Sequence, residues 1–182
     1  DPSGNVYVTG YSAGSVTGDD IVIVKYDNDG TELWAARVNY ANNLDSPSAL
    51  AVDPSGNVYV AGLTLGGGVG YDYATVKYDT NGVLLWAARY DGPLGDDFAQ
   101  ALAVDPAGNV YVTGLSTGSG GHFDFATVKY DSGGTMMWLA RYDGPAARSD
   151  YADALALDPF GNLYVTGYSL VAGTGDWEYA TV

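Results

Sequence analysis

The stretch DPSGNVYVAG at residues 53–62 occurs four times with little change. The other copies are DPSGNVYVTG at 1–10, DPAGNVYVTG at 105–114 and DPFGNLYVTG at 158–167, which gives steps of 52, 52 and 53 residues. Two further markers keep the same phase, VKYD beginning at Val24, Val76 and Val128, and a tryptophan at Trp34, Trp86 and Trp138. A fixed period of about 50 residues indicates repeated units that bury their apolar faces against each other.

Each repeat contains four short runs of the β-branched, aromatic and small apolar residues that favour strands. In the second repeat these runs are ALAVD from Ala49, NVYVAG from Asn57, YATVKYD from Tyr73 and LLWAARY from Leu84. The sequence DPSGN separates the first two runs, and its proline and glycine are typical of a tight turn. A DxxG turn at Asp79 separates the last two runs. The pattern predicts four antiparallel strands joined by hairpins.

The second run is apolar on both sides, with Val58 and Val60 on one side and Tyr59 and Ala61 on the other. A strand that is buried on both faces fits a sheet pressed between two neighbouring sheets. We therefore predict an all-β β-propeller segment of about 3.5 four-stranded antiparallel blades, each 52–53 residues long. The tryptophan of each fourth run is expected to pack against the next blade.

The chain enters just before a second strand and stops within a third strand, so the predicted segment is incomplete at both ends. We interpret it as one segment, 1–182, with a partial blade at 1–44 that lacks its inner strand, complete blades at 45–96 and 97–149, and a partial blade at 150–182 that lacks its outer strand. Open strand edges and large exposed apolar faces are rarely left free. We expect further blades, from a longer parent chain or from identical chains, to complete the ring.

The units ALAVDPxGNVYVTG and YATVKYDxxGxxLWAARYDGP resemble the seven-bladed β-propeller repeat, SBBP, and more distantly the NHL repeat. The resemblance implies that the first run of each unit is the innermost strand and that the LWAAR run is the outermost. It also implies a secreted or cell-surface protein of bacteria or archaea, and it brings no shared catalytic motif.

Composition excludes several classes of partner. The formal net charge of −15 repels nucleic acid and anionic membranes, and nearly all of the acidic residues are aspartate, which this repeat uses in its turns. Apolar runs are at most about six residues long, far short of the roughly 20 that a membrane-spanning helix needs, so we expect a soluble chain, processed or excised from a longer one. The sequence has no cysteine, so it has neither a disulfide nor a thiolate metal site. We expect no cofactor.

No catalytic constellation is apparent. His122 is the only histidine and is expected at the surface, so a Ser/His/Asp arrangement has no recurring base. The glycine-rich stretches at 66–70 and 118–121 lack the lysine and hydroxyl residue of a phosphate-binding loop. The DNDG turn at Asp27 lacks the glutamate at the twelfth position of a calcium loop. We therefore predict that the chain is not an enzyme.

One repeat position offers candidate ligand-binding residues, namely Asp45, Asp97 and Asp150 at the head of each inner strand. In a closed ring these would surround the central opening, on the rim that carries variable glycine- and serine-rich loops. They could bind a cation or a polar ligand, or each could accept backbone N–H groups of its own loop. Arginines at 37, 89 and 141 are expected to pair directly across the strands with Asp20, Asp72 and Asp124, as exposed structural pairs.

Two hypotheses for the function follow. The first is a non-catalytic structural or interaction module of a secreted or cell-surface protein, completed by further blades or by self-assembly. The second is a propeller that binds a carbohydrate or a cation on the variable rim.

Overall fold

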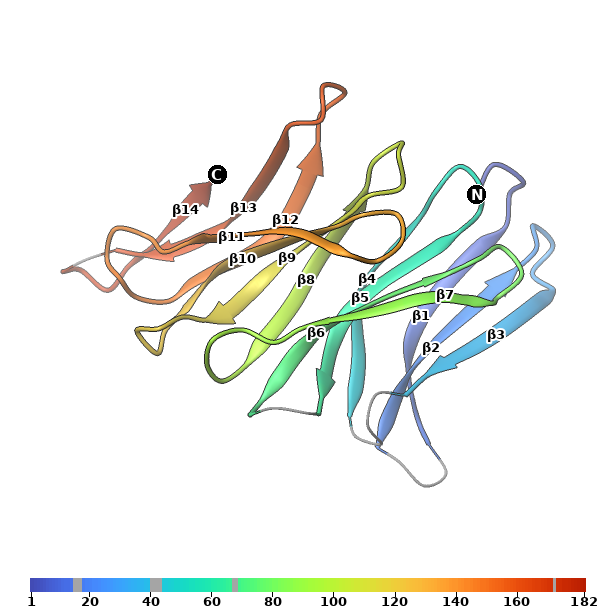
Figure 1. Cartoon of the computed structure of the whole chain (residues 1–182), viewed down its shortest axis with the longest axis horizontal. Coiled ribbons are helices and arrows are strands. Elements are labelled where there is room, and N and C mark those ends of the chain that lie inside the picture. The colour runs from blue at the N-terminus through green and yellow to red at the C-terminus, as the bar shows by residue number, and fades with distance from the viewer. Residues whose placement is uncertain (15–17, 40–43, 67–68, 172) are drawn as a thin grey trace.

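The structure is a computed structural model that describes residues 1–14, 18–39, 44–66, 69–171 and 173–182. These residues form fourteen strands, and none of them forms a helix (Figure 1). A helix that could cross a membrane is accordingly absent from the described part of the chain. The strands are β1 (Val6–Ala13), β2 (Asp19–Tyr26), β3 (Glu32–Val38), β4 (Asp45–Val52), β5 (Val58–Leu65), β6 (Tyr71–Tyr78), β7 (Leu84–Tyr90), β8 (Asp97–Val104), β9 (Val110–Thr117), β10 (Phe123–Tyr130), β11 (Met136–Tyr142), β12 (Asp150–Leu157), β13 (Leu163–Leu170) and β14 (Trp177–Thr181).

The strands form four antiparallel sheets that follow the chain order. Sheets β4-β5-β6-β7 and β8-β9-β10-β11 have four strands, whereas β1-β2-β3 and β12-β13-β14 have three. The sheets succeed one another from the blue end of the chain to the red end, and the inner strands β4, β8 and β12 contact each other in series (Figure 1). These observations confirm the predicted propeller segment with incomplete ends. We call the sheets blades one to four.

The turns form as their sequences predict. In DPSGN, the Asp53 Oδ1 atom accepts the backbone N–H groups of Ser55 and Asn57, each at 2.9 Å, and Gly56 adopts a φ of 80°. The second carboxylate oxygen accepts the Asn57 side-chain amide at 2.7 Å and the Tyr59 hydroxyl at 3.0 Å. Burial raises the pKa of Asp53, but these hydrogen bonds outweigh burial and the net pKa lies below its usual value. The aspartate therefore acts as the organiser of the turn.

The core lies between the blades. Both faces of β5 are buried, because Val58 and Val60 pack toward blade one while Tyr59 and Ala61 pack toward blade three. We call the contacts between blades one and two, two and three, and three and four the first, second and third seams. Each seam contains one cluster of buried apolar side chains. A blade in the middle of the row is thus buried on two sides, and an end blade on one.

The predicted arginine–aspartate pairs form, but their predicted register and exposure are wrong. Arg89 lies directly opposite Ala74, and its Nε reaches Asp72 diagonally at 2.7 Å. The register differs because the hairpin loop has five residues, 79–83, and because a bulge adds one residue next to Tyr78. Diagonal neighbours on a sheet remain within reach of a long side chain. The Asp72 side chain is fully buried, so this is not a surface ion pair.

Candidate functional site

The seams are joined by the tryptophan on the last strand of each preceding blade. Trp34 Nε1 donates a hydrogen bond of 3.0 Å to the backbone carbonyl of Thr80, and Trp86 Nε1 donates one of 3.1 Å to that of Ser132. Both acceptors lie in the DxxG turn of the following blade. The indole N–H of a half-buried tryptophan needs such a partner, so the turn and the tryptophan form one recognition unit.

The glycine of this turn is required by the tryptophan as well as by the backbone. Gly82 and Gly134 have φ values of 82° and 87°, which favour glycine. A β-carbon at Gly82 would lie 2.8 Å from the Trp34 ring, and one at Gly134 would lie 2.7 Å from the Trp86 ring. The indole ring therefore packs directly against the backbone of the turn glycine, which has no side chain.

A buried lysine completes each unit. The Lys25 ammonium donates to the carbonyl of Thr80 at 3.0 Å, and Lys77 donates to that of Ser132 at 3.3 Å. Each ammonium also lies over a tyrosine ring. Lys25 Nζ is 5.1 Å from the centre of the Tyr7 ring, and Lys77 Nζ is 5.0 Å from the centre of the Tyr59 ring. A buried cation is stabilised by such carbonyl and aromatic partners. We call this unit, a tryptophan and a lysine on one DxxG carbonyl, the Trp–Lys clamp.

The equivalent residues at the third seam have no such turn within the described chain. Trp138 is 38% exposed, and no hydrogen bond crosses this seam from Trp138 or Lys129 to another described residue. Lys129 still lies 4.8 Å above the Tyr111 ring, so its side chain is placed as in the other clamps. A groove of about 340 Å³ lies beside Trp138, between Phe125 and Val182. The third seam presents a clamp without its turn.

The first blade exposes the face that interior blades bury. Val6 and Val8 are 53% and 50% exposed, whereas Val58 at the equivalent position in blade two is fully buried. The sequence around these valines is the same, so the difference arises from the neighbouring blade alone. Both ends of the row thus present surfaces that are interior surfaces elsewhere in the molecule.

The three aspartates predicted as a ligand ring are buried. Asp97 Oδ2 accepts the Gly92 N–H at 2.6 Å, and Asp150 Oδ2 accepts the Gly144 N–H at 2.7 Å, so both cap the loops that lead into their own strands. Asp45 is equally buried. Burial raises the pKa of Asp97 above its usual value, although hydrogen bonds from Ser116 and Gly92 act against the rise. Their role in ligand binding stays a prediction.

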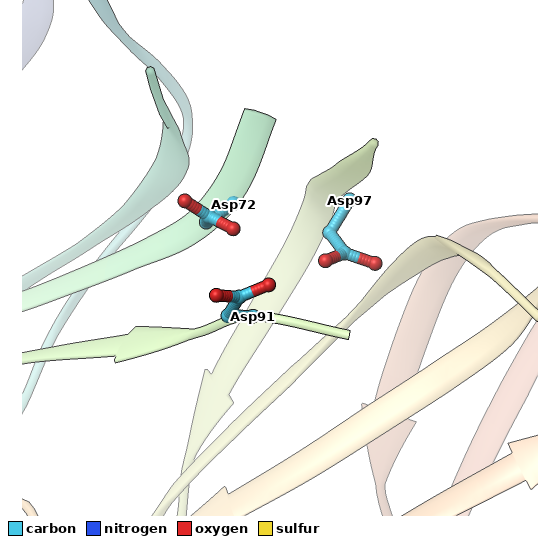
Figure 2. Close-up of side chains that lie close together, drawn as sticks. All are labelled: Asp72, Asp91 and Asp97. Atoms are coloured by element: carbon cyan, nitrogen blue, oxygen red, sulfur yellow. The ribbon is translucent and has the colours of Figure 1, made fainter. Parts of the chain in front are cut away.

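The structure brings Asp97 together with two aspartates that the sequence analysis did not connect to it. Asp72 at the head of β6, Asp91 in the loop after β7 and Asp97 at the head of β8 turn their carboxylates toward one another (Figure 2). Each contributes one oxygen to a group whose members all lie within 4.8 Å of one another. We call this group the second-seam cluster. Asp91 and Asp143 each follow an Arg-Tyr pair and lie one repeat apart, and this recurrence is the sequence signal that could have revealed the cluster.

Burial and charge both act on this cluster. Desolvation raises the pKa of Asp72 to about 6, against the opposing effect of the Arg89 guanidinium. Arg89 also contacts Asp91 through Nη2 at 3.0 Å, and Asp91 is half-exposed. The carboxylates of Asp124, Asp143 and Asp150 form an equivalent group at the third seam, where Arg141 pairs with Asp124 at 2.9 Å.

The variable rim contains a hollow of about 380 Å³. Its lining includes the aromatic rings of Tyr11, Tyr71 and Phe98 and the polar side chains of Asp19 and Ser46. The Tyr71 and Phe98 rings lie 5.5 Å apart.

The structure adds little about the other rim features predicted from the sequence. His122 is exposed, as predicted, in a short loop where the Gly118 N–H donates to its carbonyl at 2.7 Å. The rim loops that begin at Tyr11, Leu63 and Tyr168, together with the glycine-rich stretch at 66–70, lie partly outside the described residues.

Comparison with known proteins agrees with this architecture. Residues 33–68, 85–122 and 141–173, more than half of the chain, match the family model described as the beta-propeller repeat, SBBP. The chain belongs to this family. Each matched SBBP unit begins on or near the last strand of one blade and extends into the next blade, so it includes a seam.

Two individual proteins are similar to this SBBP chain. An uncharacterized WD repeat-containing protein of Acanthamoeba polyphaga mimivirus is 26% identical over 193 residues, which cover 77% of this chain and 14% of that protein. The chain thus spans a small part of the length of this curated relative. The structure of a gluconolactonase from Xanthomonas campestris aligns with 90% of this chain and 69% of its own, with 14% identity and a TM-score of 0.33.

Proposed function

We propose that this chain is a non-catalytic structural or interaction module whose two end blades bind further blades of the same SBBP repeat. The single observation that carries the proposal is the third seam, where Trp138 and Lys129 are arranged as in the two complete clamps but have no DxxG turn to bind among the described residues. We further propose that the module acts outside the cell, as part of a secreted or surface protein.

The chemistry of the partner follows from the two complete clamps. Each clamp needs a backbone carbonyl at the second position of a DxxG turn, with a glycine two residues later that lies under the indole ring. The groove beside Trp138 is lined by Leu163 and Val165, so the partner must also contribute apolar strand residues. A hairpin made of the third and fourth strands of an SBBP blade supplies all three features. Such hairpins come from a longer parent chain or from other copies.

The test is to supply this hairpin. A copy of residues 129–142, KYDSGGTMMWLARY, appended after Val182 provides the remainder of a third strand, the DxxG turn and a fourth strand. Fully burying a large apolar side chain contributes about 1.5–3 kcal/mol. We expect the free energy of unfolding to rise by ~2 kcal/mol or more, and we expect the Trp138 indole N–H to exchange more slowly with solvent, as followed by NMR.

The matched control is the same extension with valine in place of the glycine equivalent to Gly134. This side chain would collide with the indole, so the control should lose most of the gain. An extension that leaves both the stability and the exchange of the Trp138 indole N–H unchanged, or a control that stabilises equally well, contradicts the proposal.

A second candidate function, carbohydrate binding, is favoured by the hollow on the variable rim. Aromatic rings such as Tyr71 and Phe98 can stack on the apolar face of a sugar, and Asp19 and Ser46 offer hydrogen-bond partners for its hydroxyl groups. A glycan array tests this candidate. Binding that is lost in Phe98→Ala supports it, and an array without a bound glycan contradicts it.

A further inference from the structure

The second-seam cluster joins two blades through three acidic side chains from three separate elements. Asp72 and Asp91 belong to blade two, and Asp97 belongs to blade three (Figure 2). Asp72 and Asp97 are fully buried, while Asp91 is half-exposed and provides access from solvent. Three like charges held this closely repel each other unless something neutralises them.

Among the described residues, the contacts to Asp72 and Asp91 fall on one oxygen of each carboxylate. Arg89 contacts Asp72 Oδ2 at 2.7 Å and Asp91 Oδ2 at 3.0 Å, and the Gly92 N–H donates to Asp97 Oδ2. Asp72 Oδ1 is buried and has no hydrogen-bond partner in the described part of the chain. The Asp97 carboxylate, in contrast, is hydrogen-bonded by the Ser116 hydroxyl as well as by Gly92. A buried carboxylate oxygen without a partner is costly, so Asp72 Oδ1 points to a ligand that the described side chains do not provide.

The net negative charge of the cluster indicates the charge of this ligand. The three carboxylates carry three negative charges, and Arg89 offsets one of them. Arg141 approaches from blade three, where it donates to Ser116 Oγ at 2.7 Å. Its charge lowers the pKa of Asp97, but its ion pair is with Asp124 of the neighbouring cluster. The remaining charge of two matches a divalent cation.

We propose that Asp72, Asp91 and Asp97 form a binding site for a divalent cation, best fitted by Ca²⁺, that ties blade two to blade three. Two oxygens on opposite sides of a Ca²⁺ ion, each about 2.3–2.6 Å from it, lie roughly 4.6–5.2 Å apart. The cluster oxygens, all within 4.8 Å of one another, fit around such an ion. Carboxylate ligands suit calcium, magnesium and manganese, whereas zinc sites favour the histidine and cysteine ligands that this cluster lacks.

The third seam provides an internal comparison. Asp124, Asp143 and Asp150 occupy the same repeat positions, but both oxygens of Asp150 are engaged, one by the Gly144 N–H and the other by the Ser169 hydroxyl. In contrast to Asp72 Oδ1, none of the buried oxygens of this cluster lacks a hydrogen-bond partner among the described residues. The proposal is confined to the second seam, and the third seam supplies the matched control variant.

The test is calorimetric titration of the whole chain with CaCl₂ after treatment with a chelator, alongside thermal unfolding with and without CaCl₂. We expect saturable binding and a midpoint of unfolding that rises with the Ca²⁺ concentration, because a ligand that binds only the folded state stabilises it. Asp91→Asn should remove the binding and the thermal shift. Asp91 is half-exposed in a loop, so the variant should keep its strand structure, which circular dichroism verifies.

Asp143→Asn removes the same charge at the equivalent position of the third seam and should bind Ca²⁺ as the unaltered chain does. Three results overturn the proposal: no saturable binding to the unaltered chain, unchanged binding in Asp91→Asn, or equal weakening by both variants. A carbohydrate or blade-binding result has no bearing on these outcomes.

Discussion

The sequence YATV occurs in an interior blade and in an end blade, and its tyrosine is buried in the first and exposed in the second. Tyr73 in blade two is fully buried and donates its hydroxyl to the Ala126 carbonyl of blade three at 3.1 Å. Tyr179, the same residue in blade four, is 95% exposed. Both lie on the third strand of their sheets. The comparison teaches that in this repeat the neighbouring blade, and not the local sequence, decides whether a residue belongs to the core.

The turns show the opposite behaviour. Asp158 in blade four accepts the N–H groups of Phe160 and Asn162 as Asp53 accepts those of its own turn. Hydrogen bonds from Asn162 lower the pKa of Asp158. The turn is thus closed by contacts within five residues, and it forms equally well in an interior or an end blade.

The largest expected effect comes from truncating the buried tyrosine. Tyr73→Ala leaves a cavity in the second seam and removes the hydrogen bond to the Ala126 carbonyl, and such truncations of a buried aromatic cost about 3–5 kcal/mol. Tyr179→Ala removes an exposed side chain and should change stability by less than about 0.5 kcal/mol. Urea unfolding measures both. Similar losses in the two variants would break the contrast between interior and end blades.

A smaller effect separates two turn glycines of nearly equal conformation. Gly30 has a φ of 83° and open space where a β-carbon would lie, whereas Gly134 has a φ of 87° and lies against the Trp86 ring. Gly30→Ala should cost only the left-handed backbone penalty of roughly 1–2 kcal/mol. Gly134→Ala should cost a further ~1–3 kcal/mol for overpacking. Thermal unfolding of the two variants measures the difference, and equal losses would show that the clamp does not constrain the turn.

The smallest effect tests whether turns in interior and end blades are alike. Asp53 and Asp158 both have pKa values below their usual range in the folded chain. The stability that they contribute is therefore present above the unfolded pKa of about 3.9 and is lost as the pH falls through the folded pKa. In Asp53→Asn and in Asp158→Asn, the free energy of unfolding should fall less between about pH 4 and pH 2 than it does in the unaltered chain. A smaller fall in one variant only would show that the blade context matters to the turn.

Much of the fold could be predicted from the sequence because its signals are local. The period of the DPxGN and DxxG turns located the hairpins, and the two apolar sides of Val58 and Tyr59 indicated a strand with a sheet on either side. The register of Arg89 could not be predicted, because a bulge and a five-residue loop leave no clear mark in the sequence. The second-seam cluster was missed for a related reason, since Asp72 and Asp97 come from different blades.

The sequence by itself determined the repeat, the turns and the number of strands, because tight turns and strand propensity depend on residues a few positions apart. Only the tertiary structure decided which copies of a residue are buried and which acids meet at a seam. The physical reason is that an SBBP blade has two apolar faces and cannot cover either of them with its own residues. What covers each face depends on the position of the blade in the row, so four nearly identical sequences acquire different environments.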